Sequence, residues 1–381
     1  MRPRLAIIAV DDFPGRRGGF DSFVSGFAPR ACEYCDVTVY CQTRESDPAE
    51  ESFVQGVQRI ALPRRSGHRG LWMHRRECVA HALSSGASAL YLLGSTAAPL
   101  AAGLAIRHPS VSVVVNPDGV EWRRSGYRWW ERCALAGMSL SAAVGADVLV
   151  CDAQAIARRY RFLRPGRSTV VMPYAVSVQS QRVSDAATPG PDGMLPKNYY
   201  LMVGRCVREN QMLRVAQWWN GMPTQKRLAI VTDTAHTPLS GQAYATALQQ
   251  TVSESQGRVV LVGPVYDWDR LNAVRANAFA YIHGHSVGGT NPSLLEGMAC
   301  ARPIIAHDNE FNREVLGETG IYFDGNDSLS SAVSHLEQNA DSCNRLAGAV
   351  FERVQELYSW SRVMSIFSDE ILPLISSRGS P

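Results

Sequence analysis

The sequence lacks any apolar run close to the roughly 20 residues that a membrane-spanning helix needs. Its first residues, MRPRLAIIAVDDFPG, contain a short apolar run, but acidic residues follow it and no small-residue cleavage site does. A first β-strand explains this segment better than a signal peptide, so we expect a cytoplasmic protein. An apolar fraction of 45% excludes a largely disordered chain, and a length of 381 residues suggests two domains.

Patterns typical of a disulfide framework or a metal site are also missing. The chain has nine cysteines, and an odd number in a cytoplasmic protein argues against structural disulfides. Cys32 and Cys35 have the spacing of a metal or redox pair, but no second pair accompanies them. His283 and His285 flank Gly284, again without a third ligand at a suitable spacing. We therefore expect free thiols and no metal ion.

Lysine is nearly absent, since it occurs only at Lys197 and Lys226. Residues 1–180 hold 22 arginines and 15 acids (+7), whereas the remainder holds 14 arginines, two lysines and 20 acids (−4), which reproduces the net charge of +3. A basic N-terminal half suits a polyanionic partner or an anionic membrane surface, although a solvated basic face has the same composition. No nucleic-acid motif is present and the other half is acidic, so we expect no nucleic-acid partner.

Strand-like apolar runs alternate with helical stretches in both halves of the chain, which predicts the α/β class with two doubly wound, Rossmann-like parallel sheets facing across a cleft. Strands are expected at Arg4–Val10, Asp36–Gln42, Ala89–Leu93, Val111–Asn116, Val148–Asp152, Tyr199–Val203, Arg227–Thr232, Val259–Val262, Ala280–His283 and Pro303–Ala306. Helices are expected at Asp21–Arg30, Asn210–Trp219, Tyr244–Ser255, Asp267–Ala276, Pro292–Ala299, Leu329–Gln338 and Trp360–Ile375.

A polar stretch rich in proline and glycine interrupts this alternation and divides the chain. We expect an N-terminal domain over residues 1–178, a linker over 179–198 and a C-terminal domain over 199–359. Residues 360–381 form a helical segment that could cross back to the N-terminal domain.

Polar and glycine-rich segments follow several expected strands. Gly18 and Gly19 follow the first strand, where backbone N–H groups can approach an anion, although such a pair is often only a turn. Arg205 follows the first strand of the second domain. It would offer a bidentate donor fork to a phosphate, or else pair with Glu209. No G-x-G-x-x-G fingerprint is present, so a dinucleotide site is not predicted.

The strongest pattern is YIHGHSVGGTNPSLLEGMA, which runs from Tyr281 into a helix that starts at Pro292. The N–H groups of Gly289 and Thr290, together with the helix N-terminus, form a cradle for an anion or a sugar hydroxyl. One turn further on, Glu296 could accept hydrogen bonds from the vicinal hydroxyls of a ribose. A capping or ion-pairing role for this carboxylate is the alternative.

Two further segments suggest contacts with an acceptor or with lipid headgroups. Asp118 ends a strand and could bind or activate hydroxyls together with Glu121, or the segment could be only a turn. Arginines are interleaved with tryptophans in two stretches of the basic half, which suits a bilayer interface and would also suit single-stranded nucleic acid. The candidate acceptor-side or membrane residues are Glu121, Trp122, Arg64, Arg65, Arg75 and Arg76.

Taken together, these segments resemble the retaining glycosyltransferases of family 4, which have the GT-B fold. The resemblance extends over nearly the whole chain, and within the family it is to the rhamnosyltransferases of bacterial surface polysaccharide synthesis. Its most specific segments are His283–Glu296 and Ile305–Glu314, and weaker ones are Pro14–Phe20, Val37–Cys41, Asn116–Arg123, Ala146–Asp152 and Tyr200–Asn210.

This resemblance implies roles for individual residues. The implied catalytic residues are Asp118, which would touch the transferred sugar, Arg205 at the donor diphosphate, and Glu296, the second acid of an E-x7-E motif, at the nucleotide ribose. Such enzymes need no metal ion because a cationic side chain and helix N-termini stabilise the leaving diphosphate. The implied donor-binding residues are Gly18, Gly19, Arg205, Asn210, His285, Gly289, Thr290, Asn291 and Glu296. The N-terminal domain would then lie on the acceptor side and the C-terminal domain would bind the nucleotide sugar.

Three positions depart from the family pattern. Gly288 stands where the first acid of the E-x7-E motif is expected, so backbone N–H groups of the following loop and Asn291 are expected to hold the donor sugar. Asn210 replaces a common lysine, which leaves Arg205 with more of the diphosphate charge. Asp11 stands where the subgroup commonly carries an arginine, which bears on donor identity and acceptor contacts.

The expected activity is transfer of a hexosyl unit, L-rhamnosyl from dTDP-L-rhamnose, to a saccharide acceptor that is lipid-linked at the inner face of the membrane. One alternative is a transferase that uses a UDP- or GDP-sugar on a soluble acceptor or natural product. Another is a GT-B protein that binds a nucleotide sugar without turnover.

Overall fold

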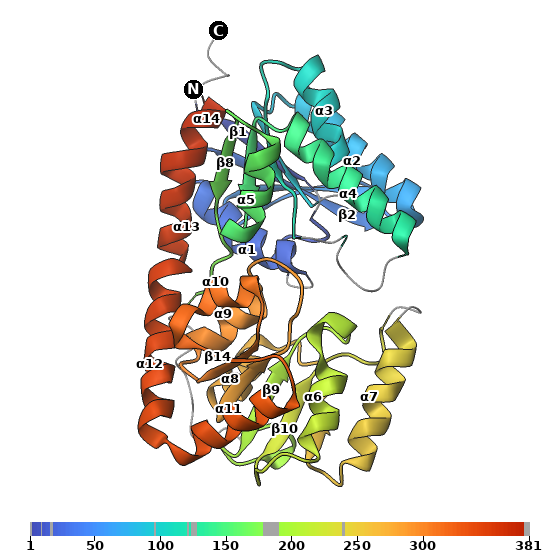
Figure 1. The fold of residues 1–381 in the computed structure, drawn as a ribbon. Coiled ribbons are helices and arrows are strands. Elements are labelled where there is room, and N and C mark those ends of the chain that lie inside the picture. Colours follow the sequence, from blue (N-terminus) through green and yellow to red (C-terminus); the bar gives the residue numbers. More distant parts are fainter. Residues whose placement is uncertain are drawn as a thin grey trace. The chain divides into compact units, whose positions relative to one another are not determined.

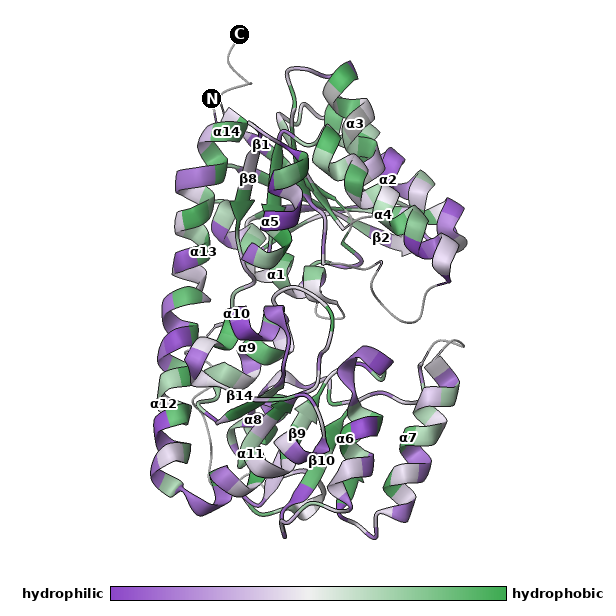
Figure 2. Ribbon diagram, viewed as in Figure 1, coloured by the Kyte–Doolittle hydropathy of each residue, from purple (hydrophilic) through white to green (hydrophobic). Residues whose placement is uncertain are grey.

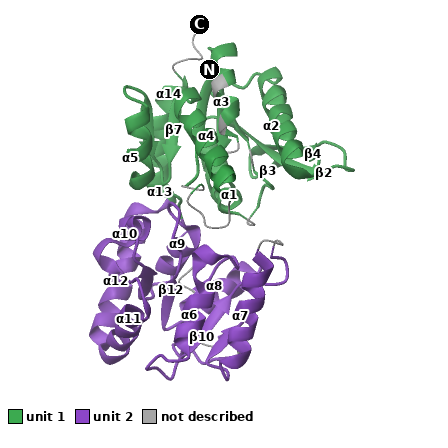
Figure 3. Cartoon of the chain, turned by 45° about the vertical axis from the view of Figure 1, so that its right-hand side comes forward, with its two compact units in different colours: residues 1–123, 127–175, 360–381 green, residues 124–126, 176–359 purple. Residues whose placement is uncertain are grey.

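The computed structural model describes residues 2–8, 10–15, 18–94, 97–119, 122, 128–177, 190–237 and 241–376. The chain divides into two compact units (Figure 3). Unit 1 holds the described residues up to Ala175 and again from Trp360, and unit 2 runs from Val176 to Ser359. The two ends of unit 2 lie side by side, because Val176 forms a parallel bridge with Ser359. Much of the predicted linker, residues 179–189, lies outside the described residues.

Unit 1 contains an eight-stranded sheet with helices packed around it (Figure 1). The strand order is β3-β4-β2-β1-β5-β6-β7-β8. Neighbouring strands pair in parallel except β3 and β4, which are antiparallel. The strands are β1 (Arg4–Ile8), β2 (Asp36–Arg44), β3 (Glu50–Val54), β4 (Val57–Arg64), β5 (Ala89–Leu93), β6 (Ser112–Asn116), β7 (Val148–Cys151) and β8 (Ser168–Val171). The helices are α1 (Gly19–Ala31), α2 (Gly67–Ser84), α3 (Ala98–Arg107), α4 (Trp129–Gly145), α5 (Gln154–Leu163), α13 (Trp360–Ile366), the π-helix η6 (Phe367–Ile371) and α14 (Leu372–Ser376).

The central strands of unit 1 are largely apolar because helices cover both faces of a parallel sheet. Every residue of β5 and β6 is buried. The hairpin of β3 and β4 was not predicted, and neither was β8. Gln55 and Gly56 join the hairpin with φ angles of 55° and 82°, the backbone that a two-residue hairpin turn requires.

The C-terminal helices pack against α1 within unit 1. Phe23 lies 6.0 Å from Trp360 between ring centroids, and Phe27 lies 5.0 Å from Phe367. A Cβ at Gly26 would come within 2.0 Å of the indole of Trp360, so only glycine permits this approach. These contacts fix the last described helices of the chain on its first helix.

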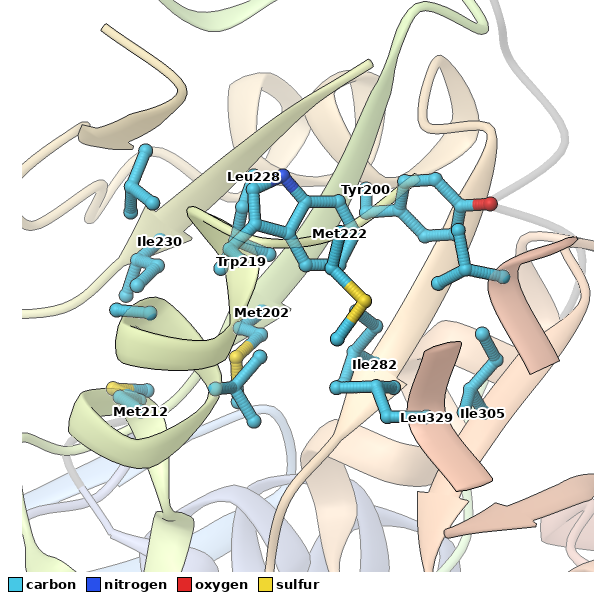
Figure 4. Close-up of a cluster of buried hydrophobic side chains, with 14 of the residues drawn as sticks. Tyr200, Met202, Met212, Trp219, Met222, Leu228, Ile230, Ile282, Ile305 and Leu329 are labelled. Carbon is cyan, nitrogen blue, oxygen red and sulfur yellow. The ribbon is translucent and has the colours of Figure 1, made fainter. Parts of the chain in front are cut away.

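Unit 2 contains a six-stranded parallel sheet in the order β11-β10-β9-β12-β13-β14. Its strands are β9 (Tyr199–Val203), β10 (Arg227–Val231), β11 (Val259–Leu261), β12 (Ala280–His283), β13 (Ile304–His307) and β14 (Ile321–Phe323). Its helices are α6 (Met212–Trp219), α7 (Gln242–Glu254), α8 (Trp268–Ala276), α9 (Pro292–Ala299), α10 (Glu310–Leu316), α11 (Asn326–Gln338) and α12 (Ala340–Leu357), with shorter turns η2 (Pro191–Gly193), η3 (Arg208–Asn210) and η5 (Gly317–Thr319). The core on β9, β10 and β12 is centred on the buried Trp219, Tyr200 and Met222 (Figure 4). The strand β14 and the helices α10 and α12 were not predicted.

No described helix combines the length and apolarity that a membrane crossing requires. All nine cysteines are free thiols, which agrees with the expectation that the chain has no disulfide framework.

Candidate functional site

Arg205 follows the carboxyl end of β9 in unit 2 and is exposed to solvent. Within the described part of the chain, no residue forms an ion pair or hydrogen bond with its guanidinium. Its backbone carbonyl accepts a hydrogen bond of 2.8 Å from Nδ2 of Asn210. Gln211 has a left-handed backbone with φ 52°, so the helix expected from residue 210 begins at Met212 instead. The sheet edge therefore presents an accessible cation that can bind an anionic ligand.

The loop that follows β12 forms hydrogen bonds with two other segments, η3 and the start of α10. Nδ1 of His285 lies 2.8 Å from Oδ1 of Asn210. The carbonyl of His285 accepts hydrogen bonds of 2.9 Å from the side-chain amides of Asn309 and Asn312, at the start of α10. The N–H of Ser286 donates to the carbonyl of Glu209 at 2.8 Å. Asn210 and His285, far apart in the sequence, thus form one hydrogen-bonded unit.

The first turn of α9 is fixed to the end of β9. Oδ1 of Asn291 caps the helix by accepting the N–H of Ser293 at 3.0 Å. The hydroxyl of Ser293 donates to the carbonyl of Val203 at 3.0 Å and lies 2.6 Å from the hydroxyl of Tyr281. The positive end of the helix dipole is therefore held beside the strand that leads to Arg205, in keeping with an anion site.

Glu296, one turn into α9, forms an ion pair with Arg275 of α8. The Arg275 side chain is 2% exposed and that of Glu296 is 13% exposed. Arg275 also donates to Oδ1 of Asn272 at 3.1 Å and lies over the ring of Trp268 at 5.5 Å. The ion-pairing alternative for Glu296 is thus present in the fold, and its contact with a ribose remains a prediction.

At residue 288, where the family pattern has an acid, the structure leaves no room for a side chain next to His285. A Cβ at this position would lie 2.6 Å from Nε2 of His285, and Gly288 has a φ angle of 155°. A side chain at residue 288 and the observed position of the His285 ring therefore exclude each other. Thr290, two residues further on, is buried, and Gly289 is partly buried.

Three histidines lie near this edge, at the ends of β12 and β13 and in the loop between them. Burial lowers the pKa of His283 well below its usual value, and His285 and His307 lower it further, so His283 is neutral. Among the described residues, no group of three or more His, Cys, Asp or Glu side chains is arranged to hold a metal ion.

The predicted site residues of unit 1 lie at the carboxyl ends of its own strands. Gly18 is the N-cap of α1 and Gly19 is the first residue of that helix. In α1, Asp21 is buried and accepts the N–H of Asp11 at 3.0 Å, and burial raises its pKa to about 6. Asp118 follows β6 in a left-handed backbone with φ 65°, and its N–H donates to Oδ1 of Asn116 at 2.8 Å.

The predicted basic residues have differing surroundings. Arg64 donates to Oε1 of Gln42 at 2.8 Å and is only partly exposed. Arg65 is exposed and lies 3.6 Å from Glu45. Arg76 lies over the ring of Trp72 at 4.7 Å. Of the remaining candidates, Arg75 and Trp122 are partly buried, and Glu121 lies outside the described residues.

Two residues at the unit 2 edge were missed by the sequence reasoning. Arg275 lies on α8, for which the sequence suggested no functional role, and its neighbouring residues do not indicate a contact with Glu296. Asn309 could have been found, because an asparagine directly after a buried strand and before a helix is a typical cap. In the structure its Oδ1 accepts the N–H groups of Phe311 and Asn312.

A family model described as "Glycosyl transferases group 1" matches residues 197–339, which is less than half of the chain but includes Arg205, His285 and Glu296. No curated protein sequence matches the chain.

Solved structures match nearly the whole chain. Sucrose-phosphate synthase from Thermosynechococcus elongatus has a TM-score of 0.82 at 17% identity, over 99% of this chain and 100% of that one. A UDP-forming trehalose-phosphate synthase from Burkholderia xenovorans has a TM-score of 0.76 at 10% identity, over 100% of both chains. Anabaena Alr3699/HepE in complex with UDP has a TM-score of 0.70 at 13% identity, over 99% and 100%. The predicted fold class, two parallel-sheet domains of the GT-B type, is confirmed.

Proposed function

We propose that this protein is a retaining, metal-independent glycosyltransferase that moves L-rhamnosyl from dTDP-L-rhamnose to a lipid-linked saccharide acceptor in bacterial surface polysaccharide synthesis. The observation that carries the nucleotide-sugar part of this proposal is the accessible Arg205, two residues after Val203, whose carbonyl holds Ser293 in the first turn of α9. These features are two sources of positive charge for a diphosphate. The match to glycosyl transferases group 1 spans both of them.

The proposed chemistry needs positive charge where negative charge develops. When the bond between the sugar and the diphosphate breaks, the leaving oxygen becomes an anion, and preorganised donors lower the barrier by stabilising it. Arg205 and the first turn of α9 supply those donors in unit 2. Attack by the acceptor hydroxyl on the same face of the sugar, with the leaving phosphate as base, would retain the anomeric configuration. A role of Asp118 toward the transferred sugar stays a prediction from the family resemblance.

Thermal-shift measurements with dTDP-, UDP- and GDP-sugars test which nucleotide sugar the protein binds. Each sugar is measured with the wild type and with the Glu296→Gln variant. A ligand at 100 times its Kd stabilises the fold by about 2.7 kcal/mol, which is a clearly visible shift. We expect dTDP-L-rhamnose to give the largest shift and Glu296→Gln to reduce it. A larger response to a UDP- or GDP-sugar would overturn the rhamnosyl assignment. A folded protein that responds to no nucleotide sugar would contradict the proposal as a whole.

We also propose that unit 1 docks on the anionic inner face of the membrane, where a lipid-linked acceptor would be found. The helix α4 supports this proposal, because Trp129, Trp130, Leu140 and Val144 are 77%, 49%, 46% and 60% exposed. Residues 130, 133, 137, 140 and 144 share one face of the helix, and none of them is charged. Much of α3 and α4 is coloured as hydrophobic in Figure 2. An apolar helix face next to arginines such as Arg128 suits a bilayer interface.

Binding to vesicles containing phosphatidylglycerol tests this docking. We expect the double variant Leu140→Ser/Val144→Ser to bind at least tenfold more weakly, because it removes apolar surface that would enter the bilayer. Arg65→Glu/Arg76→Glu should weaken binding similarly, since each basic residue near such a surface contributes about 1 kcal/mol. Arg345→Glu, at an exposed position in unit 2, is the matched control. Unchanged vesicle binding by both double variants would refute the docking surface.

A further inference from the structure

The helices α3, α4 and α5 end at the same edge of the sheet in unit 1. Each of them leads into the next strand along the chain, so their last turns lie where β6, β7 and β8 begin. These three strands are parallel neighbours in the sheet. The edge where they begin is opposite to the carboxyl ends that lead to Asp118, so a partner can bind there without covering the predicted site of unit 1.

The last turns of these helices expose large apolar side chains. Ile106 of α3 is 83% exposed, Val144 of α4 is 60% exposed, and Phe162 and Leu163 of α5 are 87% and 49% exposed. Among the large apolar side chains in the described part of the chain, that of Phe162 is the most exposed. Single exposed apolar residues are common on protein surfaces, but several at one edge indicate a binding surface.

Two arginines hold the end of α5 against the end of α4. We call residues 161–167, which form the end of α5 and the turn after it, the α5 tip. Within it, Arg164 is buried, and its guanidinium donates to the carbonyl of Ala146 at 2.6 Å. Arg167 donates to the carbonyl of Val144. The apolar side chains of the α5 tip are therefore fixed beside the C-terminal end of the exposed face of α4.

The α5 tip is basic as well as apolar. Residues 153–171 contain five arginines and no acidic residue, and Arg158, Arg161 and Arg167 are exposed. Apolar side chains surrounded by arginines suit an anionic bilayer, because the apolar groups enter the hydrocarbon while the guanidinium groups contact lipid phosphates. A fluid bilayer accommodates protruding side chains without a matching pocket, which a protein partner would have to supply.

We propose that the α5 tip is a second membrane-contact element of unit 1, with Phe162 and Leu163 inserted among anionic lipid headgroups. This inference rests on the membrane docking proposed for α4 and deepens it. The helix α4 has 17 residues and is about 25 Å long. Trp129 and Trp130 lie in its first turn, and the α5 tip is held at its other end beside Val144. Contacts at both ends would place α4 along the membrane surface instead of perpendicular to it.

Binding to vesicles containing phosphatidylglycerol tests the α5 tip separately from α4. We expect Phe162→Ser/Leu163→Ser to bind at least about tenfold more weakly, because two inserted apolar side chains are lost. Phe162→Leu keeps an apolar side chain and should stay within about threefold of wild type. Arg161→Glu should weaken binding about fivefold, and this loss should shrink in high salt. Leu195→Ser, which removes a side chain that is 69% exposed in unit 2, is the matched control.

Hydrogen–deuterium exchange of the wild type, with and without these vesicles, does not depend on how the variants fold. We expect slower exchange in peptides covering residues 158–168 when vesicles are present. Unchanged exchange there, or unchanged vesicle binding by Phe162→Ser/Leu163→Ser, would overturn the proposal. A wild-type dimer that this double variant converts to a monomer would also overturn it, because the tip would then contact a second copy of the chain.

The outcomes separate this inference from the proposed function. If the α4 variant Leu140→Ser/Val144→Ser loses vesicle binding and the α5 tip variants do not, only the role of the α5 tip is refuted. Wild-type protein that binds no vesicles would refute both contact elements. Neither result changes the thermal shifts with nucleotide sugars, which test the transferase proposal independently.

Discussion

Replacing Arg205 by alanine is expected to lower the rate of sugar transfer by about 10²- to 10³-fold, the usual effect of removing one donor that stabilises a developing anion. The guanidinium is exposed and has no partner among the described residues. Its loss should therefore change the free energy of unfolding by no more than about 0.5 kcal/mol. The steady-state release of dTDP, together with urea unfolding, measures both quantities on the same preparation.

Arg208 provides the matched control for this prediction. It is also exposed and lies three residues further on, over the ring of Tyr244 at 5.9 Å. Arg208→Ala removes the same charge from the same region and is expected to keep the transfer rate within a few-fold of wild type. If Arg205→Ala and Arg208→Ala lose activity equally, Arg205 contributes only to the local positive potential and has no specific role at the diphosphate.

The second large effect is expected at the Arg275–Glu296 ion pair. Arg275→Met leaves a largely buried carboxylate without its cation, and breaking such a pair costs about 3–5 kcal/mol of stability. We expect the urea transition of unit 2 to move to lower concentration by a corresponding amount. The double variant Arg275→Met/Glu296→Leu should recover most of this loss, because it removes the uncompensated charge as well.

Nucleotide affinity separates a structural role of this pair from a functional one. The double variant is expected to be stable but unable to bind dTDP tightly, since the carboxylate proposed to hold the ribose is gone. Arg270→Met, at an exposed position on the same helix, controls for loss of an arginine from α8. Normal dTDP affinity in the stable double variant would show that the pair serves folding alone.

Most strands of the two sheets could be predicted because a buried parallel strand is a continuous apolar run. The run at Ala89–Leu93 is buried in every residue, and β9 and β12 have the bounds that the sequence predicts. The hairpin of β3 and β4 was missed because β3 lies at the edge of the sheet and carries Glu50 and Glu51. An exposed edge strand lacks the continuous apolar run from which the buried strands were predicted.

Contacts between distant segments could not be predicted in the same way. Local sequence does not show that Gly26 of α1 makes room for Trp360, more than 300 residues later, or that Arg275 pairs with Glu296. The candidate residues that follow β9 and β12 could be predicted to lie at one edge of the sheet because parallel strands bring their carboxyl ends together. The hydrogen bond from His285 to Asn210, which joins those two loops, emerged only from the structure.

The most direct test of the central claim, that the carboxyl edge of unit 2 holds a nucleotide sugar, is hydrogen–deuterium exchange of the full-length protein with and without dTDP-L-rhamnose. The account predicts slower exchange in peptides covering residues 203–213 and 283–296, because ligand binding orders the loops that carry Arg205 and His285. Peptides from the outer helices α7 and α11 should be unchanged. Protection confined to other segments, or absent at saturating ligand, would contradict the account.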